Sequence, residues 1–258
     1  MKTVMYEVKN HIATITLNRK EAANAMSLQL LTELHDTLYK VKYDPNVRVV
    51  ILTGSGDAVF CAGADLKERA SMPPKEAKKT VSFIGTTINE VESLPQPVIA
   101  AINGAAFGGG LELALACCIR VLNEQAKVGL TEASLGIIPG AGGTQRLARL
   151  IGRGRAKELI YTARRVSATD ALHYGIVEHV VPTEAVLQKA TELAEEMVKN
   201  APLSLIQAKK AINEGLDVDS KTGFVIEKMA YDLLLGSKDR IEGLQAFKEK
   251  RVPNYKGE

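Results

Sequence analysis

The sequence predicts an α/β fold, in which helices cover a parallel sheet. Two apolar runs, Val47–Thr53 and Val98–Ile102, are typical of strands that are buried on both faces. The segments between and around these runs repeat apolar residues at helical spacing. The resulting order, β–α–β–α, favours an α/β architecture with substrate loops at the ends of the strands.

Strands and helices alternate through the first half of the chain. Lys9-Asn10-His11 lies between two segments with strand character, which predicts a hairpin. Pro45 closes the first helical segment, and Pro95 with Pro97 stops the second, because proline disfavours helix at the residue before it. The predicted strands are residues 4–8, 12–17, 47–53 and 98–102, and the predicted helices are residues 24–42, 75–93 and 111–119.

The chain becomes mainly helical after Gly152. Thr183 is a candidate N-cap for a helix that ends at Asn200. Pro202 suits the first position of the next helix, and Gly215 suits the position just after its end. The other predicted elements are helices at 156–163, 168–173 and 222–250 and a short strand at 176–181. The last quarter is therefore a helical region attached to the α/β core, with no low-complexity linker.

Composition excludes several classes of protein. The apolar fraction is 46% and the charged fraction 24%, which is typical of a globular chain and not of a disordered one. The net charge of +3 is too small to indicate nucleic acid binding by itself. Tryptophan is absent and only 5% of the residues are aromatic, which argues against a surface for stacking bases or sugars.

The three cysteines indicate the cellular compartment. Cys61, Cys117 and Cys118 are odd in number and lack metal-ligand spacing, so we expect neither a disulfide framework nor a zinc site. Free thiols suit a reducing compartment, and we expect a cytoplasmic protein. The first ten residues contain no apolar segment of signal-peptide type.

The segment Val98–Ile119 is apolar and long enough to cross a bilayer. It contains Asn103, Glu112 and the glycines 108–110, however, and a carboxylate at the centre of a membrane is costly. We therefore predict a buried strand, a turn and a helix here, and no membrane span.

Glu112 and Glu132 are candidate acid–base residues. Glu112 follows Gly108-Gly109-Gly110 and precedes an apolar helix, while Glu132 precedes a small and apolar segment. Burial without a cation raises the pKa of a carboxyl group, which suits proton transfer near neutral pH. The alternative is that each glutamate stabilises a helix N-terminus through the helix dipole.

Two glycine-rich or small-residue segments can expose backbone N–H groups. The first is the glycine run 108–110, whose free N–H groups at the start of a helix can stabilise an oxyanion. The second is Phe60–Glu68, where Lys67 adds a cation. The alternatives are a close strand–helix contact for the first segment and an ordinary strand-to-helix turn for the second. Neither segment matches a dinucleotide-binding or Walker A pattern.

Three motifs in this order resemble the crotonase (enoyl-CoA hydratase/isomerase) superfamily: FCAGADLKE at 60–68, NGAAFGGGLELALAC at 103–117 and GLTEASLGIIPGAGGTQRL at 129–147. The resemblance runs from ITLNRKEAANAMS at 15–27 to the ending AFKEKRVPNYKGE. It implies the crotonase (ClpP-like) fold, in which repeated ββα units form a spiral core, here residues 1–195. A C-terminal helical trimerisation region would follow at 196–258, with assembly as a homotrimer or a dimer of trimers.

The resemblance also implies roles for particular residues. The backbone N–H groups of Ala64 and Gly109 would hold the thioester carbonyl as it becomes an enolate, and Gly140 would help to position a water molecule. Coenzyme A would be contacted by Ala22 along its pantetheine arm, by the segment Ala62, Ala64, Asp65, Leu66 and Lys67 at its adenine end, and by Phe247 and Lys250 from a neighbouring subunit.

Hydratases of the superfamily carry glutamate at both catalytic positions, whereas the other branches commonly replace one or both, and this chain matches the hydratase pattern at Glu112 and Glu132. The implied reaction adds water to a trans-2-enoyl-CoA to give a 3-hydroxyacyl-CoA, in fatty-acid or branched amino-acid breakdown. Glu112 would activate the water as a base, and Glu132 would supply the proton as an acid. No metal or redox cofactor is implied, because coenzyme A is part of the substrate.

Two alternatives remain open at this stage. A single glutamate can shuttle a proton, so the chain could instead be an enoyl-CoA isomerase or an acyl-CoA hydrolase of the same superfamily. The motifs most resemble the methylglutaconyl-CoA hydratase branch, which includes an AU-rich RNA binder with a lysine-rich first helix. Here that helix has lysine only near its end, at Lys40 and Lys42, and phosphate contacts need clustered cations, so we do not expect nucleic acid binding.

Two residues depart from the family pattern. Cys118 replaces the usual aspartate after the catalytic helix, and Lys20 replaces the usual proline after Asn18-Arg19. The sequence leaves open the acyl chain length, its branching, the choice between trimer and hexamer, and the effect of Cys118.

Overall fold

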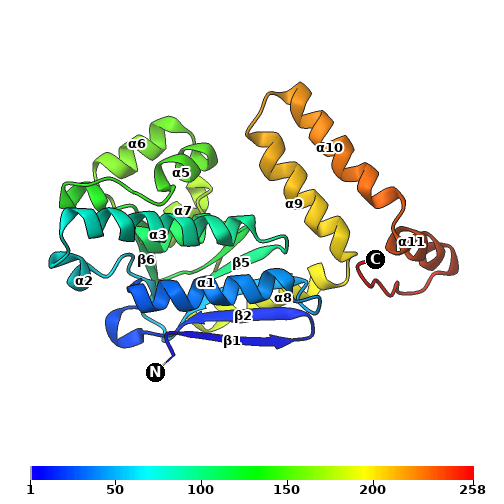
Figure 1. Ribbon diagram of the computed structural model, residues 1–258, viewed down its shortest axis with the longest axis horizontal. Coiled ribbons are helices and arrows are strands. Elements are labelled where there is room, and N and C mark those ends of the chain that lie inside the picture. Colours follow the sequence, from blue (N-terminus) through cyan, green and yellow to red (C-terminus); the bar gives the residue numbers. More distant parts are fainter. Residues whose placement is uncertain (1) are drawn as a thin grey trace.

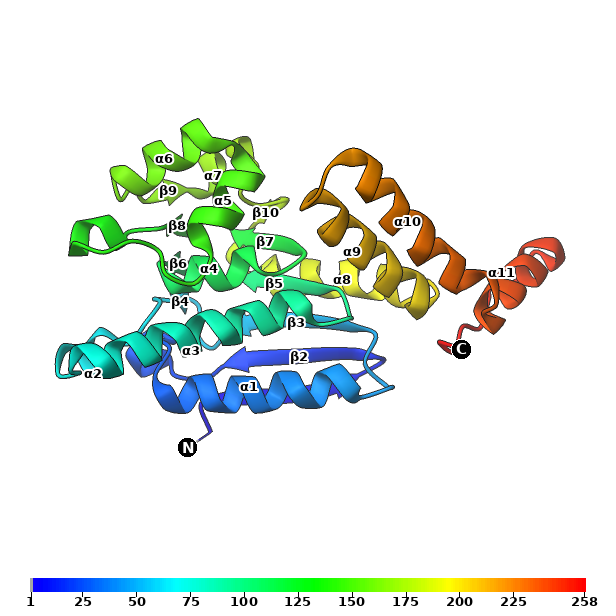
Figure 2. The same ribbon diagram turned by 45° about the horizontal axis from the view of Figure 1, so that its top comes forward.

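The computed structural model describes residues 2–258 and contains two β-sheets (Figures 1 and 2). The larger sheet is parallel except for β1, which pairs with β2 in the predicted hairpin, and the smaller sheet is parallel except for β9. The order of the larger sheet is β1 (Val4–Lys9), β2 (Ile12–Leu17), β3 (Val49–Gly54), β5 (Val98–Ile102), β7 (Ile119–Asn123) and β10 (His179–Val181). The order of the smaller sheet is β4 (Val59–Cys61), β6 (Ala105–Phe107), β8 (Lys127–Gly129) and β9 (Val166–Ser167).

Each turn of the chain adds one strand to each sheet and then returns through helical structure. β3 and β4 are followed by α2 (Leu66–Ala70) and α3 (Pro74–Ser93), and β5 and β6 by α4 (Gly109–Leu115). β7 and β8 are followed by a 3₁₀ turn at Glu132–Leu135 and by α5 (Gly143–Ile151). This succession confirms the α/β class and the repeated ββα spiral.

Helices cover both faces of the larger sheet. In β3, Val50 and Leu52 pack in the core that also contains α1 (Leu28–Tyr43) and α3, while Val49 and Ile51 pack on the opposite face against α8 (Val186–Val198). All six residues of β3 are buried. The run at 47–53 is apolar because its side chains alternate between two faces of the sheet that helices cover, as expected for a strand buried on both faces.

The C-terminal helices lie beside the core (Figures 1 and 2). α9 (Pro202–Leu216) and α10 (Ser220–Leu235) pack together, and α11 (Lys238–Glu249) follows at the C-terminal end. Lys209 Nζ of α9 donates to the carbonyl oxygens of Leu94 and Gln96, at 2.5 and 3.0 Å, which ties α9 to the core. The remaining helices, α6 (Arg153–Tyr161) and α7 (Ala168–Tyr174), lie at the other end of the core.

Several predicted boundaries were wrong. The helix predicted at 111–119 ends at Leu115, and Ile119 begins β7. Thr183 is not an N-cap, because its hydroxyl donates to Asn123 and it begins a 3₁₀ turn instead. Gly215 lies inside α9, and the helix predicted at 222–250 is two helices, with Ser237 as the N-cap of α11.

The segment Val98–Ile119 divides into β5, β6, α4 and the start of β7, which confirms the interpretation as buried elements of a globular core. Within residues 2–258, no helix combines the length and the apolar character that a membrane crossing requires. The three cysteines are unpaired, as predicted.

Candidate active site

Three neighbouring strands of the smaller sheet end at the same edge. β4, β6 and β8 are parallel neighbours, so their carboxyl ends meet there. The segments that leave these ends are Ala62–Asp65, Gly108–Gly109 and Leu130–Glu132, which carry most of the candidate residues. Ligands of parallel sheets bind at the carboxyl ends of the strands. The topology therefore brings together motifs that are distant in the sequence.

A cavity of about 540 Å³ opens at this edge. Its walls come from the three segments, from α2 and α3, and from the stretch between Thr131 and Ala141. The candidate residues that line it are Ala62, Ala64, Leu66, Gly109, Glu112, Glu132 and Gly140. Both candidate carboxylates thus face one space.

Glu112 lines the cavity and is held by two backbone hydrogen bonds. It is 2% exposed, and its Oε1 accepts hydrogen bonds from the N–H groups of Ala141 and Gly143, both at 2.8 Å. Burial raises the pKa of Glu112, against the opposing effect of these two donors and of the Arg146 guanidinium. Oε2 has no hydrogen-bond partner among the described residues and remains available for a ligand.

Glu132 is held much less tightly. Its Oε2 is enclosed and lacks a hydrogen-bond partner within residues 2–258. Burial raises the pKa of Glu132 to about 7, and the nearby charge of Glu112 acts in the same direction. A carboxyl group with this pKa exchanges protons readily near neutral pH.

The glycine run before Glu112 serves two physical purposes. Gly108 has φ of 52°, and a Cβ there would lie 3.1 Å from Glu132 Oε1, so a side chain would crowd the carboxyl group of Glu132. A Cβ at Gly110 would lie 2.0 Å from the carbonyl oxygen of Cys61, which shows that α4 packs directly on β4. Gly110 therefore makes the close strand–helix contact that was the alternative explanation for this glycine run. Gly108, by contrast, belongs to the site.

The N–H groups of Ala64 and Gly109 lie on adjacent stretches of backbone. The Cβ position of Gly109 would be 3.7 Å from the nitrogen of Ala64. Gly109 is the first residue of α4, so its N–H has no partner inside the helix. Neither N–H group has a hydrogen-bond acceptor among residues 2–258. Two free donors beside two carboxyl groups can stabilise a developing oxyanion.

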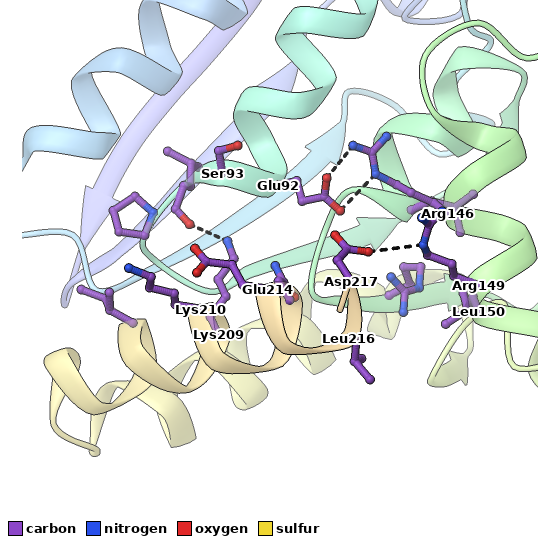
Figure 3. Close-up of a pocket in the computed structure, with 16 residues that line it drawn as sticks. Glu92, Ser93, Arg146, Arg149, Leu150, Lys209, Lys210, Glu214, Leu216 and Asp217 are labelled. Atoms are coloured by element: carbon purple, nitrogen blue, oxygen red, sulfur yellow. Dashed lines mark hydrogen bonds and ion pairs between the residues drawn. The ribbon is translucent and has the colours of Figure 1, made fainter. Parts of the chain in front are cut away.

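The loop that holds Glu112 is itself fixed by Arg146 of α5. Arg146 Nη1 donates to the carbonyl oxygen of Ala141 at 2.9 Å, and its other nitrogens form a two-point ion pair with Glu92 of α3. Figure 3 shows this pair at the edge of a second cavity, of about 700 Å³, between α3, α5 and α9. The motif at 129–147 contains Arg146, but its spacing gave no signal of this role.

Several predicted coenzyme A residues lie outside the cavity. Asp65 is the N-cap of α2: its Oδ1 accepts from the N–H groups of Lys67 and Glu68, and its Oδ2 pairs with Arg19 at 3.1 Å. Lys67 is exposed on α2. Ala22 lies in the adjacent loop, where the N–H of Ala62 donates to the carbonyl of Ala23.

Phe247 and Lys250 belong to the C-terminal region. Phe247 is 86% exposed, and Lys250 ends α11 with φ of 55°. Neither residue lines the cavity within one chain. Cys118, which departs from the family pattern, also lies outside the cavity and accepts a hydrogen bond from the N–H of Val98.

The sequence and the fold match known proteins closely. Residues 7–258 match the family model described as enoyl-CoA hydratase/isomerase. A Bacillus subtilis (strain 168) protein provisionally named an enoyl-CoA hydratase/isomerase, YngF, is 54% identical over 99% of this chain and 98% of its own length. Mouse mitochondrial methylglutaconyl-CoA hydratase is 48% identical over 98% of this chain and 82% of its own length.

A solved structure indicates the same family as these two relatives. The crystal structure of an enoyl-CoA hydratase from Bacillus anthracis superposes with a TM-score of 0.98 at 56% identity, covering 99% of this chain and 100% of that chain. This similarity confirms the crotonase fold predicted from the three motifs. The chain therefore belongs to the enoyl-CoA hydratase/isomerase family.

Proposed function

We propose that the protein is an enoyl-CoA hydratase, which adds water to a trans-2-enoyl-CoA and forms a 3-hydroxyacyl-CoA. The observation that carries this proposal is the placement of Glu112 and Glu132 on one cavity beside the free N–H groups of Ala64 and Gly109. Addition of water needs one group to take a proton from the water and one group to deliver a proton to the substrate.

The site supports a division of labour between the two glutamates. Glu112 is hydrogen-bonded through Oε1 by two N–H groups that favour its charged form, so Oε2 can accept the proton of the attacking water. Glu132 has a pKa of about 7, and its Oε2 accepts no hydrogen bond within residues 2–258, so it can hold a proton and deliver it to C2. The N–H groups of Ala64 and Gly109 stabilise the enolate oxygen that forms between these steps.

The rest of the proposal follows the family resemblance. Coenzyme A is part of the substrate, and no other cofactor takes part. The adenine end of coenzyme A lies along Ala62–Lys67. Lys250 and Phe247 reach this end from a neighbouring subunit of a trimer or a dimer of trimers. We place the protein in the cytoplasm, where free thiols such as the exposed Cys118 stay reduced, and in fatty-acid or branched amino-acid breakdown.

The test is turnover of crotonyl-CoA. Hydration removes the absorbance of the enoyl thioester and increases the mass of the product by one water. Isomerisation leaves the mass unchanged, and thioester hydrolysis releases free coenzyme A. Folded protein that yields either of the last two outcomes with its preferred substrate, and no hydrated product with any enoyl-CoA, would disprove the hydratase proposal.

A further inference from the structure

Cys118 and Lys209 lie together at the junction between α9 and the core. The Lys209 amine donates to the carbonyl oxygens of Leu94 and Gln96. Cys118 contacts the same stretch of backbone, because its N–H donates to the carbonyl oxygen of Val98 at 2.8 Å and its sulfur accepts from the N–H of Val98 at 3.4 Å. The thiol of Cys118 is within hydrogen-bonding reach of the Lys209 amine. The two side chains therefore form a pair that joins α9 to the residue before β7.

Lys209 has no carboxylate partner among the described residues (Figure 3). Glu92, a carboxylate whose charge acts on it, is paired with Arg146. Burial lowers the pKa of Lys209, whereas Cys118 and Glu92 act in the opposite direction. A partly buried ammonium group is stabilised by an adjacent anion, and here its hydrogen-bond acceptors are neutral carbonyl oxygens. An anion at position 118 would complete an ion pair with Lys209.

The thiol of Cys118 is the accessible one of the three. Its side chain is exposed, whereas Cys61 and Cys117 are buried. Burial raises the pKa of each of these two thiols to about 12, and a protonated thiol is a poor nucleophile. Oxidation by a small oxidant in solution should therefore be selective for Cys118.

We propose that Cys118 is a modification site for peroxide, and that its sulfinate product forms an ion pair with Lys209 that holds α9 on the core. The thiolate sulfur attacks one oxygen of hydrogen peroxide, and the O–O bond breaks. The hydroxide that leaves takes the proton of the sulfenic acid and becomes water. The sulfenate then reacts with a second peroxide molecule in the same way and becomes a sulfinate. Sulfur loses four electrons in total, and two peroxide molecules are reduced to water.

The sulfinate resembles a carboxylate in charge and in shape. It carries one negative charge on two oxygen atoms, so it can accept a charge-assisted hydrogen bond from the Lys209 ammonium group. α9 leads into α10 and α11, so this contact stabilises the attachment of the C-terminal helices to the core. In a reducing compartment the thiol is the resting form, and the sulfinate marks exposure to peroxide.

The experiment combines substitution of Cys118 with peroxide treatment of the full-length protein. Cys118→Asp places a permanent carboxylate beside Lys209, and Cys118→Asn has a similar shape without the charge. We expect Cys118→Asp to melt about 2–4 °C above Cys118→Asn, the shift of one modest stabilising interaction in a chain of this size. The parent protein treated with hydrogen peroxide should shift in the same direction. Peptide mass spectrometry should find two added oxygen atoms on Cys118.

Three further variants serve as controls. Cys118→Ser, treated with the same peroxide, should not shift, which accounts for oxidation of methionine. Lys209→Met should abolish the difference between Cys118→Asp and Cys118→Asn. Lys210→Met removes an exposed charge from the next position of α9 and should preserve that difference.

Three results would overturn the proposal. The first is an equal melting temperature for Cys118→Asp and Cys118→Asn, a comparison that remains valid even if Lys209→Met fails to fold. The second is peroxide treatment that leaves Cys118 unmodified or joins it to Cys117 in a disulfide. The third is a difference between the Asp and Asn variants that survives Lys209→Met, which would assign the stabilisation to another cation.

Discussion

Glu112 and Glu132 face the same cavity, but their surroundings differ. Burial raises the pKa of both carboxyl groups, but at Glu112 two N–H groups and the charge of Arg146 oppose that rise. The Oε2 atom of Glu132 is enclosed and has no hydrogen-bond partner within residues 2–258. Pairs of titratable groups whose environments separate their pKa values are characteristic of acid–base sites. Their different environments support the proposed roles of Glu112 as the base and Glu132 as the acid.

The pair should produce a bell-shaped pH profile. The active form carries one proton on the pair, so kcat/KM should fall above about pH 7, where the pair loses that proton, and also at acid pH, where it gains a second. Hydration and dehydration should share one profile, because the reaction takes up no net proton. The measurement is kcat/KM in both directions from pH 5 to 9. A hydration rate that keeps rising from pH 6 to 9 would contradict the assignment.

Arg146 should act as a positioning residue for Glu112. Arg146→Met removes the hydrogen bond to the Ala141 carbonyl oxygen. It also removes the cation that lowers the pKa of Glu112. We expect kcat to fall about 10- to 100-fold with little change in KM, because the loop that orients Glu112 loosens. The acid limb of the pH profile should also move to higher pH, since the pKa of Glu112 rises.

Arg149→Met provides the control for Arg146. Arg149 lies on the same helix, but it is largely exposed and pairs with Asp217, away from the loop that holds Glu112 (Figure 3). A loss of activity in Arg146→Met with an unshifted acid limb would indicate a purely structural role.

At the scale of elements, α2 connects the oxyanion segment to the cavity wall. Burial opposes ionisation of Asp65, but the N–H groups of Glu68 and Lys67 and the charge of Arg19 together lower its pKa. Asp65→Ala should therefore reduce the free energy of unfolding by about 1–2 kcal/mol, the usual cost of losing an N-cap and a modest ion pair. It should also lower kcat/KM, because Ala64 precedes the cap directly.

Asp65→Asn tests the same helix more gently. Asparagine keeps an acceptor for the Lys67 and Glu68 N–H groups but loses the charge that pairs with Arg19. Chemical denaturation of both variants is the measurement, with Asn expected to cost less than Ala. If both variants were as stable as the parent protein, the N-cap would contribute nothing to the free energy of unfolding.

The long elements could be predicted from the sequence, and the short ones could not. Apolar runs and helical spacing located the larger sheet and most helices, because these signals extend over many residues. The strands of the smaller sheet span only two or three residues, too few for periodicity, yet β4, β6 and β8 build the site. The motif resemblance, and not periodicity, placed Ala64, Gly109, Glu112 and Glu132 together, while the contact of Arg146 with the loop that holds Glu112 became visible only in the structure.

At the scale of the whole molecule, the C-terminal helices expose an unusual amount of apolar surface. Leu216, Phe224, Met229, Leu233 and Phe247 are each between 64% and 86% exposed. Patches of this kind mark protein–protein interfaces. The helices that leave the core thus present the surface on which the family resemblance predicts trimerisation.

Substitution on α10 tests that surface. We expect the parent protein to sediment at three or six times the chain mass of 27.8 kDa. Met229→Asp should shift the population toward single chains, because it places a charge in an apolar contact. Lys228→Asp, at an exposed polar position beside it, is the control, and circular dichroism verifies folding. A parent protein that sediments as one chain would contradict the assembly.

The central claim is that Glu112 and Glu132 act together to hydrate an enoyl-CoA. Replacement of each by glutamine preserves shape and removes proton transfer, so Glu112→Gln and Glu132→Gln should each lower kcat for crotonyl-CoA about 10²- to 10⁴-fold. The double variant should lose far less than the product of the two effects, because the residues work as a unit. Binding of butyryl-CoA should persist, since Ala64 and Gly109 act through their backbone. Near-normal hydration by Glu132→Gln would contradict the account and favour a reaction that uses one glutamate.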